Sequence, residues 1–326
     1  MPLNIQDQPP VKAGSRWHPH ARHRANMTPV PSPVTNVLSV DVEDYFHAEI
    51  FSDTVPRSSW ESYPSRVERN TMRLLELFAT FNVRATFFVL GWVAERQPRL
   101  VREIAAMGHE VACHSYWHKP IYKLNPDEFR KDTVRAKNVI EQALGQTVTG
   151  YRAPTFSIVK QSLWALDILA EEQFKYDSSI FPIRHDRYGI PEAPRVPFYV
   201  PTSAGPFLEC PITTFAVFKK MNFPLGGGGY LRLLPEWYTR MGLKKIHAEG
   251  LALICYVHPW EIDPEQPRLE KRPHKRLRHY TNLSKTYDRL KRMLQAYRFT
   301  SFRDSKLSQF ARECHLTTRN NHDHQC

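Results

Sequence analysis

The stretch Val37-Leu38-Ser39-Val40-Asp41-Val42-Glu43-Asp44 joins an apolar run to a cluster of carboxylates. The apolar part, from Asn36 to Val40, predicts a buried β-strand, and the acidic residues follow at its C-terminal end. In proteins built on parallel strands, functional side chains gather at the C-terminal ends of the strands. The stretch therefore predicts both an α/β core and the position of a site.

Strand and helix patterns alternate along most of the remaining chain. Further strands are predicted at 84–90, 109–112, 148–151, 174–176 and 251–257, with short strand-like pieces near 198–200 and 207–209. Helices are predicted at 65–81, 97–107, 125–144, 160–172, 235–249 and 282–297. This alternation indicates a parallel sheet, and 326 residues suffice for one barrel-sized domain or two ordinary ones.

Two histidines, His114 and His118, follow the predicted strand at 109–112. Neutral imidazole is the commonest metal ligand among side chains, although two histidines four residues apart are weak evidence in a chain with 15 of them. A carboxylate from the acidic cluster at the end of the first strand would complete a set that leaves coordination positions open for water. The pattern predicts a hydrolytic metal site.

The net charge of +12 and the pI near 9.5 require a separate account. Basic residues gather in the N-terminal segment and between Arg268 and Arg292, but no base-reading motif accompanies them. We therefore expect no nucleic-acid partner. An anionic glycan, a lipid-linked phosphate or an acidic membrane surface fits the charge equally well.

The chain ends carry predictions about order and location. Residues 1–36, rich in Pro, His and Arg, predict a disordered basic arm, and residues 306–326 a flexible tail. We see no signal peptide and no apolar run of membrane-spanning length. The five cysteines are odd in number and scattered, which suits a reducing compartment. We expect a cytoplasmic protein with peripheral contact to the inner membrane through its basic C-terminal segment.

Five motifs lie in a defined order along the chain: Ser39 to Asp44, the pair His114 and His118, Arg152-Ala153-Pro154, Asp177, and Tyr256-Val257-His258. Together they resemble the motifs of polysaccharide deacetylases of the NodB-homology type, carbohydrate esterase family four. Three further stretches resemble the subgroup found with exopolysaccharide and exosortase loci. They are Asp41 to Phe46, the run Gly226–Gly229 before Tyr230, and His258-Pro259-Trp260-Glu261.

The resemblance implies a fold and its boundaries. We expect a distorted (β/α) barrel of seven strands over residues 37–305, with an insertion at about 181–250. The run Gly226–Gly229 lacks a following Lys-Ser/Thr pair, so we expect a mobile lid rather than a phosphate-binding loop.

The resemblance also implies residue roles. Asp41 would be the base, oriented by Arg152, and His258 the general acid, tuned by Asp177. A divalent metal, Zn²⁺ before Co²⁺ or Ni²⁺, would be held by His114, His118 and either Glu43 or Asp44. Three aromatic residues are candidates for stacking on a sugar, with core packing as the alternative: Tyr45, Phe46 and Trp260.

The implied reaction is metal-dependent hydrolysis of a linear amide, the N-acetyl group of an amino sugar. The expected substrate is a polysaccharide or its lipid-linked precursor in exopolysaccharide biosynthesis. Two alternatives stay open at this point. One is a cyclic-amide hydrolase similar to the allantoinases, and the other is a catalytically inactive glycan-binding protein.

Overall fold

The structure is a computed structural model that describes residues 34–218, 221–314 and 316. The chain divides into two units, residues 1–31 and 32–326, and every described residue belongs to the second. The predicted basic arm therefore lies outside the described residues except for 34–36. Asn36 at its end is already the first residue of strand β1 and is buried.

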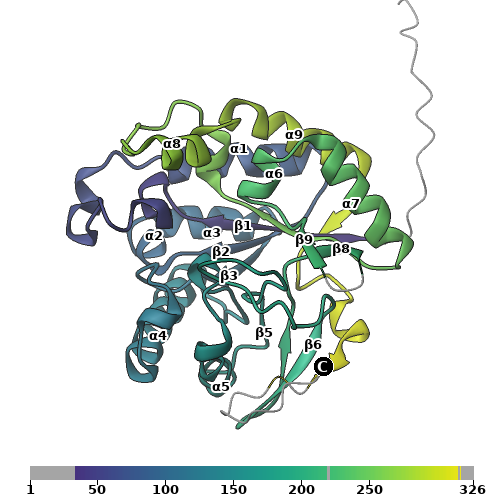
Figure 1. The fold of residues 1–326 in the computed structure, drawn as a ribbon. Coiled ribbons are helices and arrows are strands. Elements are labelled where there is room, and N and C mark those ends of the chain that lie inside the picture. The colour runs from purple at the N-terminus through teal and green to yellow at the C-terminus, as the bar shows by residue number, and fades with distance from the viewer. Residues whose placement is uncertain (1–33, 219–220, 315, 317–326) are drawn as a thin grey trace, which may run out of the picture. The chain divides into compact units, whose positions relative to one another are not determined.

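One large sheet organises this unit, and helices surround it (Figure 1). Seven neighbouring strands of the sheet run parallel, in the order β10-β1-β2-β3-β4-β5-β7. Their bounds are β1 Asn36–Val42, β2 Thr86–Val89, β3 Glu110–Cys113, β4 Gly150–Tyr151, β5 Tyr176–Asp177, β7 Gly205–Glu209 and β10 Ile254–Val257. The predicted α/β architecture with a mainly parallel sheet is confirmed.

The remaining strands flank this run or form a hairpin. They are β6 Phe198–Thr202, antiparallel to β7, β8 Thr214–Phe218 with β9 Met221–Pro224, β11 Phe299–Thr300 beside β1, and β12 Arg312–Glu313 beside β6. Strand β7 lies inside the segment predicted as an insertion, so that segment contributes to the barrel itself. The predicted flexible tail is wrong for its first residues, because η8 (Leu307–Phe310) and β12 are ordered there and β12 pairs with the edge strand β6.

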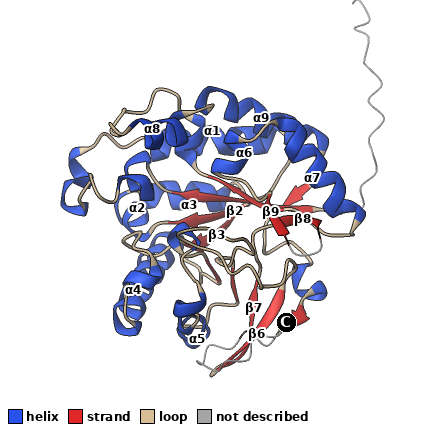
Figure 2. Ribbon diagram, in the orientation of Figure 1, coloured by secondary structure: helices blue, strands red, loops and turns tan. Residues whose placement is uncertain are grey.

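Helices cover the sheet between consecutive strands, as Figure 2 shows. Their bounds are α1 Val67–Thr80, α2 Gly91–Arg96, α3 Pro98–Ala106, α4 Pro126–Leu144, α5 Trp164–Glu171, α6 Gly229–Leu233, α7 Glu236–Ala248, α8 Pro273–Tyr280 and α9 Leu283–Ala296. The start of α4 illustrates how the sequence fixes an end. The side chain of Asn125 accepts from the backbone N–H of Glu128 at 2.9 Å, and the Glu128 carboxylate accepts from the Asn125 N–H at 3.1 Å.

The two ends of the parallel run, β7 and β10, are joined through an intervening segment rather than by direct pairing. The backbone N–H of Thr213 donates to the Ile254 carbonyl at 3.2 Å, and the N–H of Tyr256 donates to the Gly226 carbonyl at 2.9 Å. At Gly227 (φ 108°) an added Cβ would lie 2.1 Å from the carbonyl oxygen of Tyr256. The glycine run thus packs flat against β10, and the predicted mobile lid is wrong.

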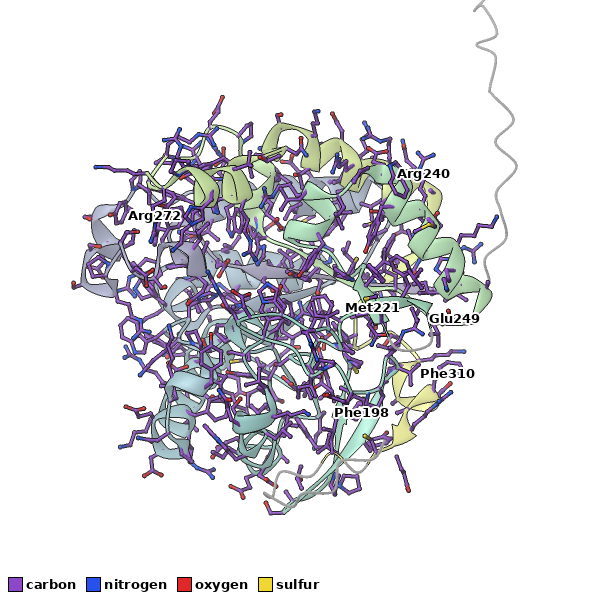
Figure 3. The ribbon with its side chains drawn as sticks, viewed as in Figure 1. Phe198, Met221, Arg240, Glu249, Arg272 and Phe310 are labelled. Atoms are coloured by element: carbon purple, nitrogen blue, oxygen red, sulfur yellow. The ribbon has the colours of Figure 1, made fainter. Side chains whose placement is uncertain are left out.

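The outer surface carries charged and apolar side chains. Arg240 on α7 and Phe310 near the C-terminal end lie at the periphery in Figure 3, and Phe310 is 69% exposed.

Three thiols, Cys113, Cys210 and Cys255, are free and buried, whereas Cys314 is disulfide-bonded. None of the described helices combines the length and apolar character needed to cross a bilayer.

Candidate metal and hydrolytic site

Four strands of the parallel run deliver polar side chains to one end of the sheet. Asp41 is the next-to-last residue of β1, and Glu43 follows that strand directly. His114 follows β3, Arg152 follows β4 and His258 follows β10. All five side chains are mostly or fully buried, so each needs a charged or hydrogen-bonding partner. The rule for parallel sheets correctly located this cluster.

Glu43, His114 and His118 form a group of potential metal ligands, with one ligand atom from each lying within 4.8 Å of the others. The Nε2 of His118 lies 2.6 Å from Oε2 of Glu43, at ion-pair distance. The Nδ1 of His114 lies 2.8 Å from the carbonyl oxygen of Arg152, which leaves Nε2 available. One carboxylate and two imidazoles aimed at a common point fit a divalent metal such as Zn²⁺.

The electrostatics of Glu43 and His114 agree with a role as metal ligands. Burial lowers the pKa of His114 to about 4, so its imidazole is neutral at neutral pH. Burial alone would raise the pKa of Glu43, but the positive charge of His118 and of the other histidines outweighs it and lowers that pKa well below its usual range. The same pairing raises the pKa of His118 against the effect of its burial. Glu43 is thus held as a carboxylate.

Asp44, the other candidate for the metal carboxylate, serves the backbone instead. Its Oδ1 accepts from the N–H of Tyr45, and its Oδ2 accepts from the hydroxyl of Ser65 at 2.8 Å and the N–H groups of Arg66 and Val67 at 2.8 and 3.1 Å. These bonds tie the loop after β1 to the start of α1. Because both oxygens are occupied, the structure favours Glu43 and does not bring Asp44 into the cluster.

Asp41 is fixed by a buried arginine. Its Oδ1 accepts from Nη1 of Arg152 at 2.7 Å, and the same nitrogen donates to the hydroxyl of Ser39 at 2.7 Å. The rest of the guanidinium donates to Ser178, through its carbonyl at 3.0 Å and its hydroxyl at 3.0 Å. Arg152 is fully buried, so this is a rigid, charge-assisted contact that leaves Oδ2 of Asp41 facing the pocket.

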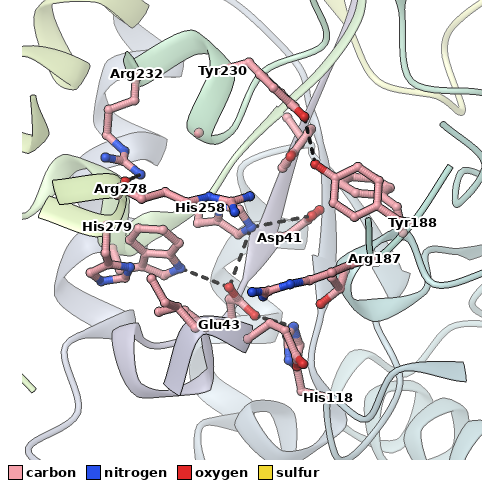
Figure 4. A pocket seen from close by; sticks show the side chains of 18 of the residues that line it. Asp41, Glu43, His118, Arg187, Tyr188, Tyr230, Arg232, His258, Arg278 and His279 are labelled. Carbon is pink, nitrogen blue, oxygen red and sulfur yellow. Dashed lines mark hydrogen bonds and ion pairs between the residues drawn. The ribbon is translucent and has the colours of Figure 1, made fainter. Parts of the chain in front are cut away.

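His258 follows β10, the neighbour of β1, and faces both carboxylates, as Figure 4 shows. Its Nε2 lies 3.6 Å from Oε1 of Glu43 and 4.0 Å from Oδ2 of Asp41. Its Nδ1 lies 3.0 Å from Oε2 of Glu261, whose other oxygen accepts from Nε of Arg232 at 3.1 Å. Burial lowers the pKa of His258, but the hydrogen bond and charge of Glu261, with the two carboxylates, raise it to about 9.

Glu261 takes the role that the sequence assigned to Asp177. The hydrogen bonds of Asp177 go to the N–H of Ser179 at 3.1 Å and its hydroxyl at 2.6 Å, and that hydroxyl accepts from the N–H of Ala153 at 2.7 Å. Asp177 therefore supports the turn beside Arg152 rather than tuning His258. The signal that would have found Glu261 is its i+3 spacing from His258, since a 3-10 turn places both on one side.

Of the three aromatic residues considered for stacking on a sugar, two lie in the core and one lines the pocket. Tyr45 is fully buried and Phe46 is 2% exposed, so both are core residues and stacking on a sugar is wrong for them. Trp260 lines the pocket, and its Nε1 donates to Oε1 of Glu43 at 2.9 Å. Its ring also stacks on His258, with centroids 4.9 Å apart. Trp260 thus holds a ligand carboxylate and the imidazole beside it.

The fold and the donor set define an α/β protein with a divalent-metal site at the C-terminal ends of its parallel strands. Two segments of the chain match family models of known proteins. Residues 53–172 match the family described as polysaccharide deacetylase, and residues 178–306 match a domain of unknown function, DUF3473. Residues 53–172 are thus similar to polysaccharide deacetylases, and the segment that matches the domain of unknown function follows them in the chain.

Individual relatives cover only part of the chain. A peptidoglycan-N-acetylglucosamine deacetylase of Bacillus cereus is 34% identical over 98 residues, 30% of this chain and 36% of the relative. A chitooligosaccharide deacetylase of a Bradyrhizobium strain is 34% identical over 101 residues, 31% of this chain and 43% of the relative. The chain thus spans less than half the length of these relatives. A candidate polysaccharide deacetylase from Mycobacterium smegmatis has a similar fold, with a TM-score of 0.50 and 21% identity over 82% of this chain and 93% of the other.

Proposed function

We propose that this protein hydrolyses the N-acetyl groups of amino sugars in a polysaccharide, with a divalent metal held by Glu43, His114 and His118. The observation that carries the proposal is the placement of two proton-transfer groups around the ligand cluster. Asp41 and His258 approach it from different strands, with Nε2 of His258 4.0 Å from Oδ2 of Asp41. Amide hydrolysis needs both a base for water and an acid for the departing amine.

The residues divide this work by their protonation states. Asp41, held by Arg152, accepts the proton of the attacking water through its free oxygen. His258, whose pKa of about 9 keeps it charged at neutral pH, donates a proton to the leaving amine. Glu261 and Arg232 keep the imidazole in the orientation that points Nε2 into the pocket. A divalent metal, with Zn²⁺ favoured by the donor set, would polarise the acetyl carbonyl and lower the pKa of water.

We further propose that the natural substrate is an exopolysaccharide or its lipid-linked precursor, deacetylated in the cytoplasm at the inner membrane. The support is the motif resemblance and the basic residues on and before α8, such as Lys271 and Arg276. Cell fractionation with a tagged chain tests the location, and acetylation of the exopolysaccharide in a deletion strain tests the substrate.

The central experiment measures acetate release from N-acetylglucosamine oligomers by metal-stripped protein, with and without added Zn²⁺, Co²⁺ or Ni²⁺. We expect release only with metal, and none from a His114→Ala variant. Release from allantoin instead would favour the cyclic-amide hydrolase. Stoichiometric metal binding without release from any amide, or no metal binding at all, would contradict the proposal and leave a glycan-binding protein.

A further inference from the structure

The side chains that line the pocket around the proposed site leave positive charge without a negative partner. Its carboxylates have partners: Asp41 pairs with Arg152, Glu43 lies among histidines, and Glu49 lies 3.5 Å from Lys123. The lining also contains the guanidinium groups of Arg187 and Arg278, which approach from two sides in Figure 4.

Arg278 extends from a helix that is docked firmly beside the site. The carbonyl of Arg278 accepts from Nη2 of Arg232 at 3.0 Å, and the next residue, His279, stacks on Trp260 with centroids 4.5 Å apart. His279 is also bonded to Gln266 at 2.9 Å. Across the part of the chain that the structure describes, the side chain of Arg278 has no ion pair or hydrogen bond. A fixed backbone therefore presents an uncompensated charge to the pocket.

Arg187 comes from the opposite side, in a loop fixed by aromatic stacking. The ring of Tyr188 stacks on Phe181 at 5.9 Å and on His185 at 3.8 Å, and its hydroxyl lies 3.0 Å from that of Tyr230. The ion pair of Arg187 is with Asp186, at 3.9 Å, and the Asp186 side chain is 74% exposed. Such an exposed contact contributes little and leaves the guanidinium available.

These two arginines belong to the segment after Asp177, whereas the hydrolytic base and the metal ligands belong to the segment before it. Arginine forms forked, charge-assisted hydrogen bonds with carboxylate and phosphate groups. A neutral glycan would leave both guanidinium groups without a partner of opposite charge. The excess positive charge around the acetamido position therefore favours a substrate that carries an anion nearby.

We propose that the pocket selects an anionic substrate, an N-acetylated sugar bearing a carboxylate or phosphate group that Arg187 and Arg278 contact. This inference rests on the deacetylase function proposed above and names its substrate class. The charge lies on the glycan itself, as a uronate, or on a diphosphate attached to the sugar. Both present oxygens of the same chemistry to the arginines.

Matched substrates test the proposal on the unmodified, metal-loaded protein. The first pair is the N-acetylglucosamine tetramer and a tetramer that alternates N-acetylglucosamine with glucuronate. The second pair is methyl N-acetylglucosaminide and UDP-N-acetylglucosamine. We expect kcat/KM to be about tenfold or more higher for the anionic member of at least one pair, and this preference to shrink as salt is raised to about 0.5 M. The pair that responds identifies the anion.

Variants locate the preference within the pocket. Arg187→Gln and Arg278→Gln should each reduce the ratio of anionic to neutral kcat/KM by about fivefold. The controls are Arg184→Gln in the same loop and Arg276→Gln in the same helix, neither of which lines this pocket. We expect both controls to keep the ratio. A ratio that falls equally in the controls would overturn the assignment to Arg187 and Arg278.

Affinity for the same substrates, measured in parallel by titration calorimetry, separates this inference from the proposed function. Acetate release that is equal for both members of both pairs, with equal affinities, would overturn the anionic substrate and leave the deacetylase intact. Absence of acetate release with metal bound would contradict the deacetylase. In that case tighter, salt-sensitive binding of the anionic member would still support the anion site, and equal binding would end both proposals.

Discussion

The segments on either side of Asp177 contribute to one pocket in different ways. The first, which ends near Arg152, delivers the proposed metal ligands and the proposed base from the ends of β1 and β3, and Arg152 from the end of β4. The second, within 178–306, delivers His258 from β10 and the arginines of the rim. Residues 53–172, which include His114, His118 and Arg152 but neither Asp41 nor Glu43, match a family with a described activity, and residues 178–306 match a domain of unknown function. In the proposed function, the first segment supplies the base and the metal ligands, and the second supplies the acid and the contacts that select the substrate.

The largest expected effect falls on the metal ligands of the first segment. Glu43→Gln removes the anionic ligand and should abolish stoichiometric metal binding, with acetate release reduced by more than about a hundredfold. Elemental analysis and acetate release measure both. Asp44→Asn is the matched control, because Asp44 bonds to the start of α1 and not to the cluster. It should lower the melting temperature but keep the metal. Loss of metal in Asp44→Asn with metal retained in Glu43→Gln would reverse this assignment.

Asp41→Asn separates catalysis from metal binding within the same segment. The amide is nearly isosteric with the carboxylate but cannot accept the proton of water. Acetate release should therefore fall by about 10²–10⁴-fold. Metal content, measured on the same sample, should be unchanged because Asp41 is not in the ligand group. A variant with near-normal release would show that another group is the base.

Glu261→Gln tests how the second segment completes the site. Glu261 raises the pKa of His258 to about 9, so loss of its charge should lower that pKa. In the proposed mechanism His258 donates a proton and is active only when protonated. The pH at which activity declines on the alkaline side should therefore be lower in the variant than in the parent. The maximal rate should also fall by about 10–100-fold. Asp177→Asn provides the comparison, since Asp177 bonds to Ser179 and not to His258. A pH profile that moves with Asp177→Asn instead would restore the sequence-based assignment.

The sequence predicted the first segment better than the second, and the reason is physical. Asp41, His114 and Arg152 each follow a short apolar strand, so local pattern and parallel topology suffice to bring them together. The partner of His258 depends on a turn after β10. The surroundings of Phe46 depend on side chains farther along the chain, Trp60 and Trp92. Contacts of that kind leave no local periodicity.

The smallest expected effect concerns the connection between the two segments. Asp263, just after His258 in the chain, accepts hydrogen bonds from the α1 flank: two from Arg66, at 2.5 and 3.0 Å, one from Arg69 at 3.1 Å and one from Asn70 at 3.0 Å. These partners outweigh its burial and lower the pKa of Asp263 to about 2. Asp263→Asn should therefore lower the free energy of unfolding by about 1–2 kcal/mol at neutral pH.

The pH dependence of this loss has a defined sign. An aspartate with a depressed pKa stabilises the folded protein above its unfolded value, about 4, and this contribution disappears as the pH falls through about 2. The difference in unfolding free energy between parent and Asp263→Asn, measured by denaturant titration, should shrink over that window. Asp304→Asn, whose ion pairs at the protein surface are 3.7 Å long, should show no such difference. A difference independent of pH would mean that the amide disturbs packing rather than charge, and that the two segments are held together mainly by their apolar contacts.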